Sequence, residues 1–290
     1  MKSLLRALAG GVILATPLFV QAQHYTPGVE GIKAATLPPP GVYLRDYNVM
    51  YWSGQVNGPT GHEAGPPDFN AFVYANVPRL VWITDTTVLG GYLGVDALLP
   101  ILYQNITAGG GKTETSGIGD MFMEGTLSWH PKMFDFSVGA GFWAPSGTAF
   151  SSSNPDPGLN CWSPMLTAGA TVYFDTNRTW AVSALNRYEF NTEDDSGVTP
   201  GQTYTLEWGV SKTLAKVFDV GAVGYYQLQT KADSGPGASP GKGMAASVGP
   251  EVSMAFPDIM TFVSVRYLYE FTAQNTSQGQ AVVLTVTKRF

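Results

Sequence analysis

Short and long connections alternate along most of this chain, and this alternation restricts its fold more than any other feature. Turn signals divide the sequence into twelve strand-like segments. They span residues 41–53, 68–83, 87–104, 118–130, 133–145, 161–174, 178–190, 202–213, 217–230, 243–256, 259–272 and 280–290. Connections after even-numbered segments are short, namely 84–86, 131–132, 175–177, 214–216 and 257–258. Those after odd-numbered segments, such as 54–67, 105–117, 146–160 and 231–242, are long and rich in Gly, Pro, Ser and Asn.

This sorting of connections by length is typical of closed antiparallel membrane barrels, which have short periplasmic turns and long extracellular loops. A soluble sandwich has no reason to sort its loops in this way. The pattern therefore predicts an all-β fold, a closed antiparallel transmembrane β-barrel of about 12 strands. An even number of strands places both termini of the barrel on the periplasmic side.

The residues within the clearest segments separate into two faces. One face of segment 217–230 carries Phe218, Val220, Ala222, Gly224, Tyr226 and Leu228, and the other carries Asp219, Gly221, Val223, Tyr225, Gln227 and Gln229. Side chains of a strand alternate between its two faces. The apolar face therefore suits lipid, and the other face suits a water-filled lumen.

Tryptophan positions support the same arrangement independently. Trp82, Trp129 and Trp180 lie at the predicted periplasmic ends of strands, and Trp52, Trp143 and Trp162 lie at the outer ends. Indole prefers the membrane–water interface because it joins an apolar body to an N–H that needs a partner. We therefore expect these six residues to form two interface girdles.

The two ends of the chain carry the expected signals for export and assembly. Residues 1–22 combine Lys2 and Arg6 with an apolar stretch and a small-residue site, which predicts a cleaved signal peptide. The Pro-rich residues 23–40 are not expected to form a strand, and they lie either in the periplasm or inside the lumen. The barrel itself spans residues 41–290 and ends on Phe290, an ending typical of outer-membrane barrels, where we expect an assembly signal.

Composition excludes several other classes of protein. Loss of Lys2 and Arg6 with the signal peptide lowers Lys plus Arg from 16 to 14, against 22 Asp plus Glu, so no basic surface is available for nucleic acid. After residue 22 no apolar run reaches the roughly 20 residues of a membrane helix. The single Cys161 cannot form an internal disulfide.

The N-terminal residues 24–47 resemble the start of exported proteins in the family named after the meta-pathway of phenol degradation. The matching elements are Tyr25, Pro27-Gly28, Gly31, the Pro-Pro-Pro-Gly run at 38–41 and Tyr43-Leu44. Beyond this stretch the likeness is in rhythm only, with glycine-rich strands and a final Phe. The resemblance implies an outer-membrane barrel that passes small, often aromatic or apolar, compounds.

Charged residues on the polar strand faces form the candidate site. They are Asp96, Asp120, Glu124, Arg187, Glu189, Glu207, Glu251, Arg266 and Glu270. Several of them fall near strand midpoints, where a charge must be paired or hydrated. Two interpretations remain open: a polar constriction that selects what passes, and a salt-bridged network that fills a narrow lumen.

Catalysis is a weaker interpretation. An outer-membrane lipid-modifying enzyme of the serine type needs a His within reach of its nucleophile. Only His130 has such a neighbour, Ser128, and the pair faces the lumen beside a periplasmic turn. The triplet 111–113 lacks the first glycine of a phosphate-binding loop, and the acidic loop 191–197 is interpreted as solvated charge. The sequence therefore predicts no enzyme, no cofactor and no metal.

These patterns together favour a monomeric or weakly oligomeric outer-membrane channel that passively transports small molecules, including aromatic or apolar compounds. A structural or adhesive surface barrel without a conducting pore is the main alternative. Expected partners are outer-membrane lipids and lipopolysaccharide, the barrel-assembly machinery and small-molecule solutes. Nucleic acid is not an expected partner.

Overall fold

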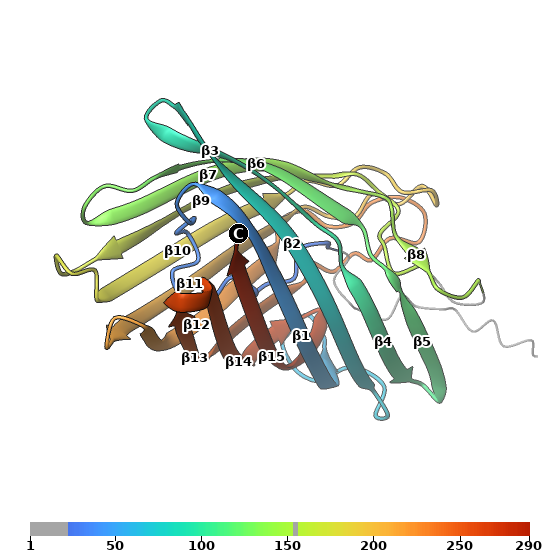
Figure 1. Ribbon diagram of the computed structural model, residues 1–290. Helices are drawn as coiled ribbons and strands as arrows, with labels where there is room; N and C mark the ends of the chain where they lie inside the picture. The colour runs from blue at the N-terminus through green and yellow to red at the C-terminus, as the bar shows by residue number, and fades with distance from the viewer. Residues whose placement is uncertain (1–22, 153–155) are drawn as a thin grey trace, which may run out of the picture.

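One antiparallel sheet closes on itself in this protein (Figure 1). The computed structural model describes residues 23–152 and 156–290, so the predicted signal peptide lies outside the described residues. The strands are β1 (Gly41–Asn57), β2 (Asn70–Val88), β3 (Gly91–Leu98), β4 (Ile101–Ala108), β5 (Gly111–Ile118), β6 (Met121–Trp129), β7 (Phe134–Ala144), β8 (Thr148–Ala149), β9 (Ser163–Tyr173), β10 (Trp180–Glu189), β11 (Thr203–Leu214), β12 (Phe218–Gln229), β13 (Met244–Phe256), β14 (Thr261–Gln274) and β15 (Thr276–Arg289). β1 pairs with β15 on one side and with β2 on the other, which completes the circle.

Two of the barrel strands are divided. Only Leu99 and Pro100 separate β3 from β4, and only Gly119 and Asp120 separate β5 from β6. With each pair counted as one strand, and with the two-residue β8 set aside, the sheet is the closed twelve-stranded antiparallel barrel that the sequence predicts. One 3-10 turn, η1 (Pro257–Ile259), forms a short connection. None of the helices among the described residues is long and apolar enough to cross a membrane.

The first short turn lies later than expected. The expected connection at 84–86 is part of β2, which shifts register in this region and continues to Val88. Leu89 and Gly90 form the turn instead, with φ angles of 51° and 78°. Two consecutive positive φ angles suit a tight hairpin turn, and they fix the position of this one.

The expected outer loop at 105–117 is mostly strand. β4 and β5 form a hairpin there that turns at Gly109 and Gly110, both with positive φ. The Asp68 carboxylate accepts the backbone N–H groups of these two glycines at 2.8 and 2.7 Å. The glycines of the expected loop therefore form only a tight turn, and the polar residues on either side of them belong to β4 and β5.

A row of interruptions crosses one side of the barrel wall. β2 changes its partner from β4 to β3 at Pro78, which has no N–H to donate. The Leu99 N–H donates to the Pro78 carbonyl at 3.2 Å, and the Gly119 N–H donates to the Pro100 carbonyl at 2.8 Å. The wall therefore stays hydrogen-bonded where β2 changes partner and the two neighbouring strands are interrupted.

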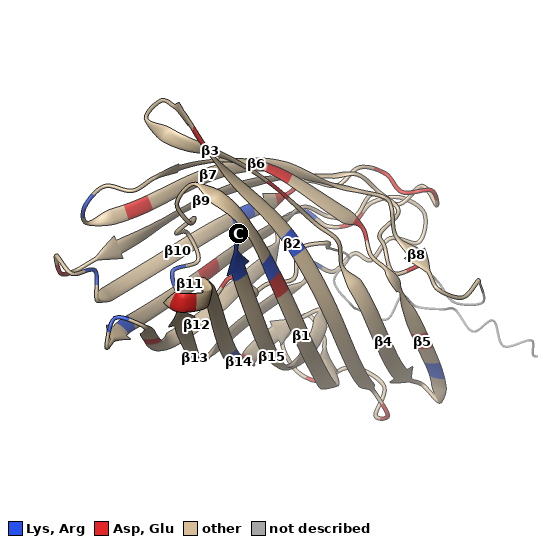
Figure 2. Cartoon of the chain, in the orientation of Figure 1, with Lys and Arg blue, Asp and Glu red and all other residues tan. Residues whose placement is uncertain are grey.

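The two faces of the sheet differ in polarity as the alternation predicts. Inward-facing side chains such as Thr171 and Gln227 are buried, whereas outward-facing ones such as Leu80 and Phe262 are exposed. Charges of both signs are distributed along the strands and at the turns (Figure 2).

Five of the six predicted girdle tryptophans point outward. Four are exposed, by 37 to 54%, namely Trp52, Trp82, Trp162 and Trp180. Trp129 stacks on Phe136 with ring centroids 4.6 Å apart and donates its indole N–H to the Leu89 carbonyl at 3.0 Å. The expectation for Trp143 is wrong, because it is only 4% exposed and shares the inward-facing parity of Ser137 on β7.

Residues 23–40, called the internal segment here, fold back into the lumen and connect to β1. This is one of the two placements that the sequence left open. Lys33 Nζ lies 3.0 Å from a carboxylate oxygen of Asp219 on β12, and Thr36 Oγ1 donates to Asp135 on β7 at 3.1 Å. The internal segment thus contacts strands on different sides of the barrel.

Gly31 fits the internal segment closely against the wall. Its φ is +72°, a left-handed conformation that favours glycine. A Cβ at this position would lie 2.1 Å from Glu251 Oε2 and 2.6 Å from Arg266 Cζ. Any larger residue would therefore push against a buried ion pair.

Candidate site in the barrel lumen

All nine lumen candidates are buried inside the barrel. They are Asp96, Asp120, Glu124, Arg187, Glu189, Glu207, Glu251, Arg266 and Glu270. Most of them contact the internal segment directly or through one further side chain. Glu270 stands apart and accepts hydrogen bonds from the hydroxyls of Tyr225 and Tyr51, the latter at 3.1 Å.

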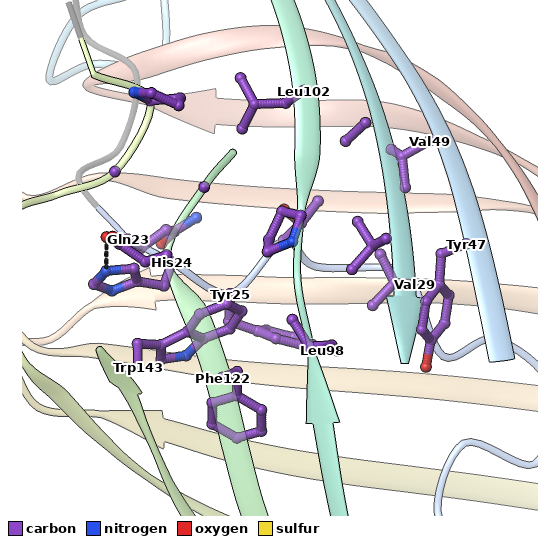
Figure 3. A pocket seen from close by; sticks show the side chains of 18 of the residues that line it. Gln23, His24, Tyr25, Val29, Tyr47, Val49, Leu98, Leu102, Phe122 and Trp143 are labelled. Carbon is purple, nitrogen blue, oxygen red and sulfur yellow. Dashed lines mark hydrogen bonds and ion pairs between the residues drawn. The ribbon is translucent and has the colours of Figure 1, made fainter. Parts of the chain in front are cut away.

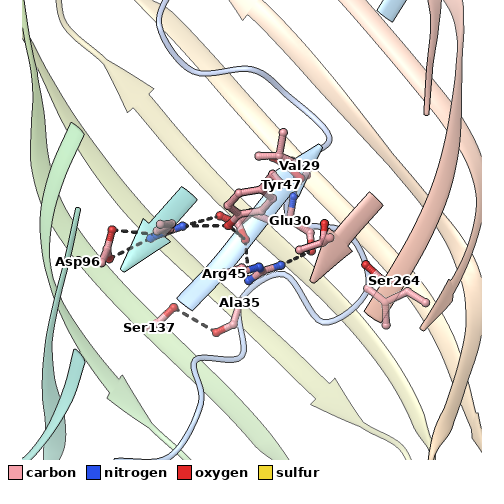
Figure 4. Close-up of polar contacts among 12 residues, drawn as sticks. Val29, Glu30, Ala35, Arg45, Tyr47, Asp96, Ser137 and Ser264 are labelled. Carbon is pink, nitrogen blue, oxygen red and sulfur yellow. Dashed lines mark hydrogen bonds and ion pairs between the residues drawn. The ribbon is translucent and has the colours of Figure 1, made fainter. Parts of the chain in front are cut away.

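Three arginines surround the carboxylate of Glu30, which belongs to the internal segment. Figure 4 labels Glu30 and one of these arginines, Arg45. Arg79 Nη1 and Arg187 Nη2 lie 2.9 and 3.0 Å from Glu30 Oε1, and Arg45 Nη1 lies 3.0 Å from Oε2. The Tyr47 hydroxyl also donates to Oε2, at 3.2 Å. Arg45, Arg79 and Arg187, called the arginine cage here, come from β1, β2 and β10.

The carboxylate of Glu30 is ionised in this environment. Burial alone would raise the pKa of Glu30, but the charges of Arg45, Arg187 and Arg79 outweigh burial and hold it well below its usual range. Charge-assisted hydrogen bonds of this kind are about twice as strong as neutral ones. Glu30 therefore anchors the internal segment to the wall.

Arg79 links the cage to two of the predicted lumen residues. Its guanidinium forms a bidentate pair with Asp96, with Nε–Oδ1 at 2.8 Å and Nη2–Oδ2 at 2.9 Å. Nη2 also lies 3.4 Å from Glu124 Oε2. Figure 4 shows the paired Asp96 on the wall facing the internal segment.

Sequence reasoning missed Glu30, Arg45 and Arg79. Glu30 lies outside any strand, so alternation says nothing of it. Arg79 faces inward from β2, but its inward neighbours include Val77 and Val81, so that face of the strand looks like a lipid-facing one. An arginine within an apolar strand face was the available signal.

Arg266 and Glu251 form a second buried ion pair against the internal segment, with Nε–Oε2 at 3.1 Å. Arg266 Nη1 donates to the carbonyls of Gly28, at 3.1 Å, and Val29. The Ile32 N–H donates to Glu251 Oε2 at 2.9 Å. The pair therefore holds backbone on both sides of Glu30.

Glu207 binds the same stretch of chain through hydrogen bonds. It accepts hydrogen bonds from the Tyr25 hydroxyl and from the backbone N–H of Glu30, the latter at 3.0 Å. The ring of Tyr25 in turn lies under Arg187, whose Cζ is 4.2 Å from the ring centroid. Backbone and side chains of the internal segment are thus both held by the wall.

His24 holds the far end of the internal segment. Its Nε2 lies 2.8 Å from Asp120 Oδ2, its Nδ1 lies 3.3 Å from Glu189 Oε1, and its ring stacks on Trp143 at 5.2 Å. Burial lowers the pKa of His24, but the hydrogen bonds to Asp120 and Glu189 outweigh burial and raise it above its ordinary value. A protonated imidazole therefore suits this site.

Asp120 also organises the long loop that follows β7. Its carboxylate accepts the backbone N–H groups of Ser146, Gly147 and Leu159 at 2.9, 2.7 and 2.7 Å. One carboxylate thus connects the internal segment, the break between β5 and β6, and a long loop.

Two cavities flank the arginine cage. The outer cavity, of about 200 Å³, lies toward the long loops and has mainly apolar walls (Figure 3). These walls include Val49, Val73, Ala75, Leu98, Leu102 and Phe122. The inner cavity, of about 410 Å³, lies toward the short turns and has more polar walls, including Lys33, Thr36, Asp219, Ser253 and Thr287. Glu30, Arg79 and Arg187 line both cavities, so the cage separates them.

Ser128, His130 and Asp135 have the connectivity of a catalytic triad. His130 Nε2 lies 3.2 Å from Ser128 Oγ, and Nδ1 lies 3.1 Å from Asp135 Oδ1. However, Ser128 is 0% exposed and lines neither cavity. Asp135 is also bound by Arg178 and Tyr173, which is typical of a structural network at the barrel end. The arrangement offers no access for a substrate.

Comparisons with solved structures agree with this architecture. An outer membrane channel from Pseudomonas putida F1 superposes with a TM-score of 0.78 at 14% identity, covering 92% of this chain and 100% of that one. The β domain of the Bordetella autotransporter BrkA gives a TM-score of 0.50 at 12% identity, covering 87% and 100%. The translocator domain of NalP from Neisseria meningitidis gives 0.50 at 12% identity, covering 87% and 90%. No curated protein sequence matches the chain.

A family model matches residues 53–286, which is most of the barrel. This range begins after the N-terminal stretch on which the resemblance in the sequence rested, so the two observations are separate. The chain has the fold of an outer-membrane channel and belongs to the family described as "Putative MetA-pathway of phenol degradation".

Proposed function

We propose that this protein is a channel that passively passes small molecules, including apolar and aromatic compounds, across the outer membrane. The observation that carries the proposal is the outer cavity inside the barrel, whose walls are mainly apolar and which lies directly beside the charged arginine cage. A lumen that is simply filled by side chains would not be expected to keep such a cavity. The name of the similar P. putida protein, an outer membrane channel, and the family description agree with this function.

The apolar lining follows one side of the barrel. β2 turns Ala71, Val73, Ala75 and Val77 inward, and β4 turns Leu102 toward them. A solute with little polar surface meets matching walls along this side, because apolar contacts need no exchange of hydrogen bonds. The outward face of the same part of β2 carries the aromatic Phe72 and Tyr74.

In the proposed mechanism the internal segment controls passage. It holds Glu30 in the arginine cage between the two cavities, so a solute passes when the segment shifts within the lumen. The predicted lumen residues that line the cavities then form the polar side of the passage, namely Asp120, Glu124, Arg187, Glu251 and Arg266. Export by a cleaved signal peptide and assembly through Phe290 complete the proposal.

The test is transport by refolded full-length protein in planar bilayers and in vesicles with lipopolysaccharide in one leaflet. We expect small but measurable conductance and uptake of benzyl alcohol as the neutral aromatic probe. Val73→Thr, in the outer cavity, should lower this uptake severalfold. Val56→Thr, a buried position that lines neither cavity and packs among Phe69, Ala71 and Ile106, should leave it unchanged. A wild-type barrel with neither conductance nor uptake removes the transport function.

A further inference from the structure

We propose that the arginine cage is a binding site for the carboxylate of a solute, and that Glu30 occupies it as an internal ligand until a solute displaces it. The solute class is then a small carboxylate with an apolar or aromatic body. This inference deepens the proposed channel function and rests on it.

The cage is built like a carboxylate receptor. Its three guanidinium groups come from the wall, on β1, β2 and β10, whereas the carboxylate comes from the internal segment. Both oxygens of Glu30 are bound, at 2.9 to 3.2 Å, by groups that a solute carboxylate could meet in the same way. Guanidinium groups match planar carboxylates better than other cations do.

Two cage arginines depend on Glu30. Among the described residues, Glu30 is the only ion-pair partner of Arg45 and of Arg187. If Glu30 leaves, both guanidinium groups lose this ion pair, and only the more distant charges of Glu124, near Arg187, and Glu251, near Arg45, remain. Loss of an ion pair in a buried site is costly, so an anion that takes the place of Glu30 favours its release.

Arg187 also has donors to spare. Its Nε and Nη1 have no hydrogen-bond partner among the described residues, and neither has Nε of Arg45. Buried donors of this kind are normally satisfied. A solute that can approach from a different direction than the internal segment could satisfy more of them than Glu30 does.

The outer cavity supplies room for the rest of the solute. It reaches the cage through Arg79 and Arg187, and its nearby walls are Val49, Leu98 and Phe122 (Figure 3). Its volume of about 200 Å³ exceeds the roughly 150 Å³ of an apolar cavity that holds benzene. A carboxylate on a single ring therefore fits, with its head in the cage and its body in the cavity.

The test measures binding by titration calorimetry on the refolded full chain in detergent. The probes are benzoate, benzyl alcohol as its neutral counterpart, acetate as the head without the body, and inorganic phosphate. Glu30→Gln removes the charge of the internal competitor, so benzoate should bind at least tenfold tighter than to the wild type. Adding Arg187→Gln should abolish that gain. Glu63→Gln, an exposed loop carboxylate, is the matched control and should change nothing.

The outcomes separate this inference from the channel function. Equal benzoate affinity in wild type and Glu30→Gln overturns the inference, and so does displacement of benzoate by an equal concentration of phosphate. Benzyl alcohol binding that rises as much as benzoate binding in Glu30→Gln also overturns it. Uptake of benzyl alcohol without any carboxylate effect would keep the channel function and remove the internal-ligand role. Heat-modifiable gel migration confirms that each variant folds. Glu30→Asp is the second variant, and its gain in benzoate affinity should be smaller than that of Glu30→Gln.

Discussion

Replacing Gly31 by alanine should loosen the internal segment without harming the barrel. The added methyl group forces a non-glycine residue into φ +72°, which costs about 1–2 kcal/mol. It also meets Glu251 Oε2 at 2.1 Å and the guanidinium of Arg266 at 2.6 Å, so the buried pair has to move. Both costs vanish when the segment leaves its site.

The backbone cost alone corresponds to about a tenfold shift toward the released segment, because 1.4 kcal/mol is a factor of ten. Hydrogen exchange of the amides in residues 23–40 measures this shift, since exchange follows local opening. We expect the amides of Glu30 and Ile32, which donate to Glu207 and Glu251, to exchange at least tenfold faster in Gly31→Ala.

Gly237→Ala is the control for backbone strain. Gly237 has φ +74°, almost the same as Gly31, but nothing lies within 4 Å of a Cβ there. It should leave exchange of the internal segment unchanged. Equal exchange in wild type and Gly31→Ala would refute the claim that the fit at Gly31 holds the segment in place.

Three further predictions concern other contacts. Because the pKa of His24 is raised, the stability that His24 gives to the internal segment is fully present below its ordinary pKa of 6.5 and is lost as pH rises through the raised pKa. Hydrogen exchange of residues 23–27 should therefore accelerate above pH 6.5 by more than the intrinsic exchange rate does. His24→Gln should abolish this excess. Arg266→Ala leaves Glu251 unpaired and should destabilise the barrel by about 3–5 kcal/mol in denaturant titrations, with altered conductance, whereas Arg266→Lys should lose less. Deletion of Phe290, which is 70% exposed, should lower the amount of protein in the outer membrane while refolded protein keeps nearly the same stability; normal membrane levels would contradict its role as an assembly signal.

Sequence alternation predicted the barrel because the strand period is set by the backbone. Side chains at i and i+2 share a face in every strand, so buried polar residues such as Glu207 and Asp96 could be assigned to the interior one by one. Turn length predicted the antiparallel order because a short turn can only join two strands that lie side by side.

The apolar inner wall escaped prediction because polarity was used to decide which face is inside. On β2 the inward residues Val73 and Val77 are apolar, and the outward face includes Asn76 and Pro78, so the rule inverts. The prediction for Trp143 was wrong for a related reason. Its position at a strand end suggested the membrane interface, but its place in the strand alternation turns the side chain inward. Residues 23–40 have no period, so only tertiary contacts place them.

The long sequence separations across the lumen have a consequence for how the protein folds. Arg187 bonds Glu30 across 157 positions, and Arg266 bonds Gly28 across 238. The internal segment directly precedes β1, the strand that meets β15 at the seam of the barrel. Residues 23–40 therefore have to be inside the curling sheet before that seam forms, or else thread through a finished ring. By the first route, ring closure and enclosure of the segment are a single late step. By either route the contacts across the lumen have high contact order, which makes folding slow.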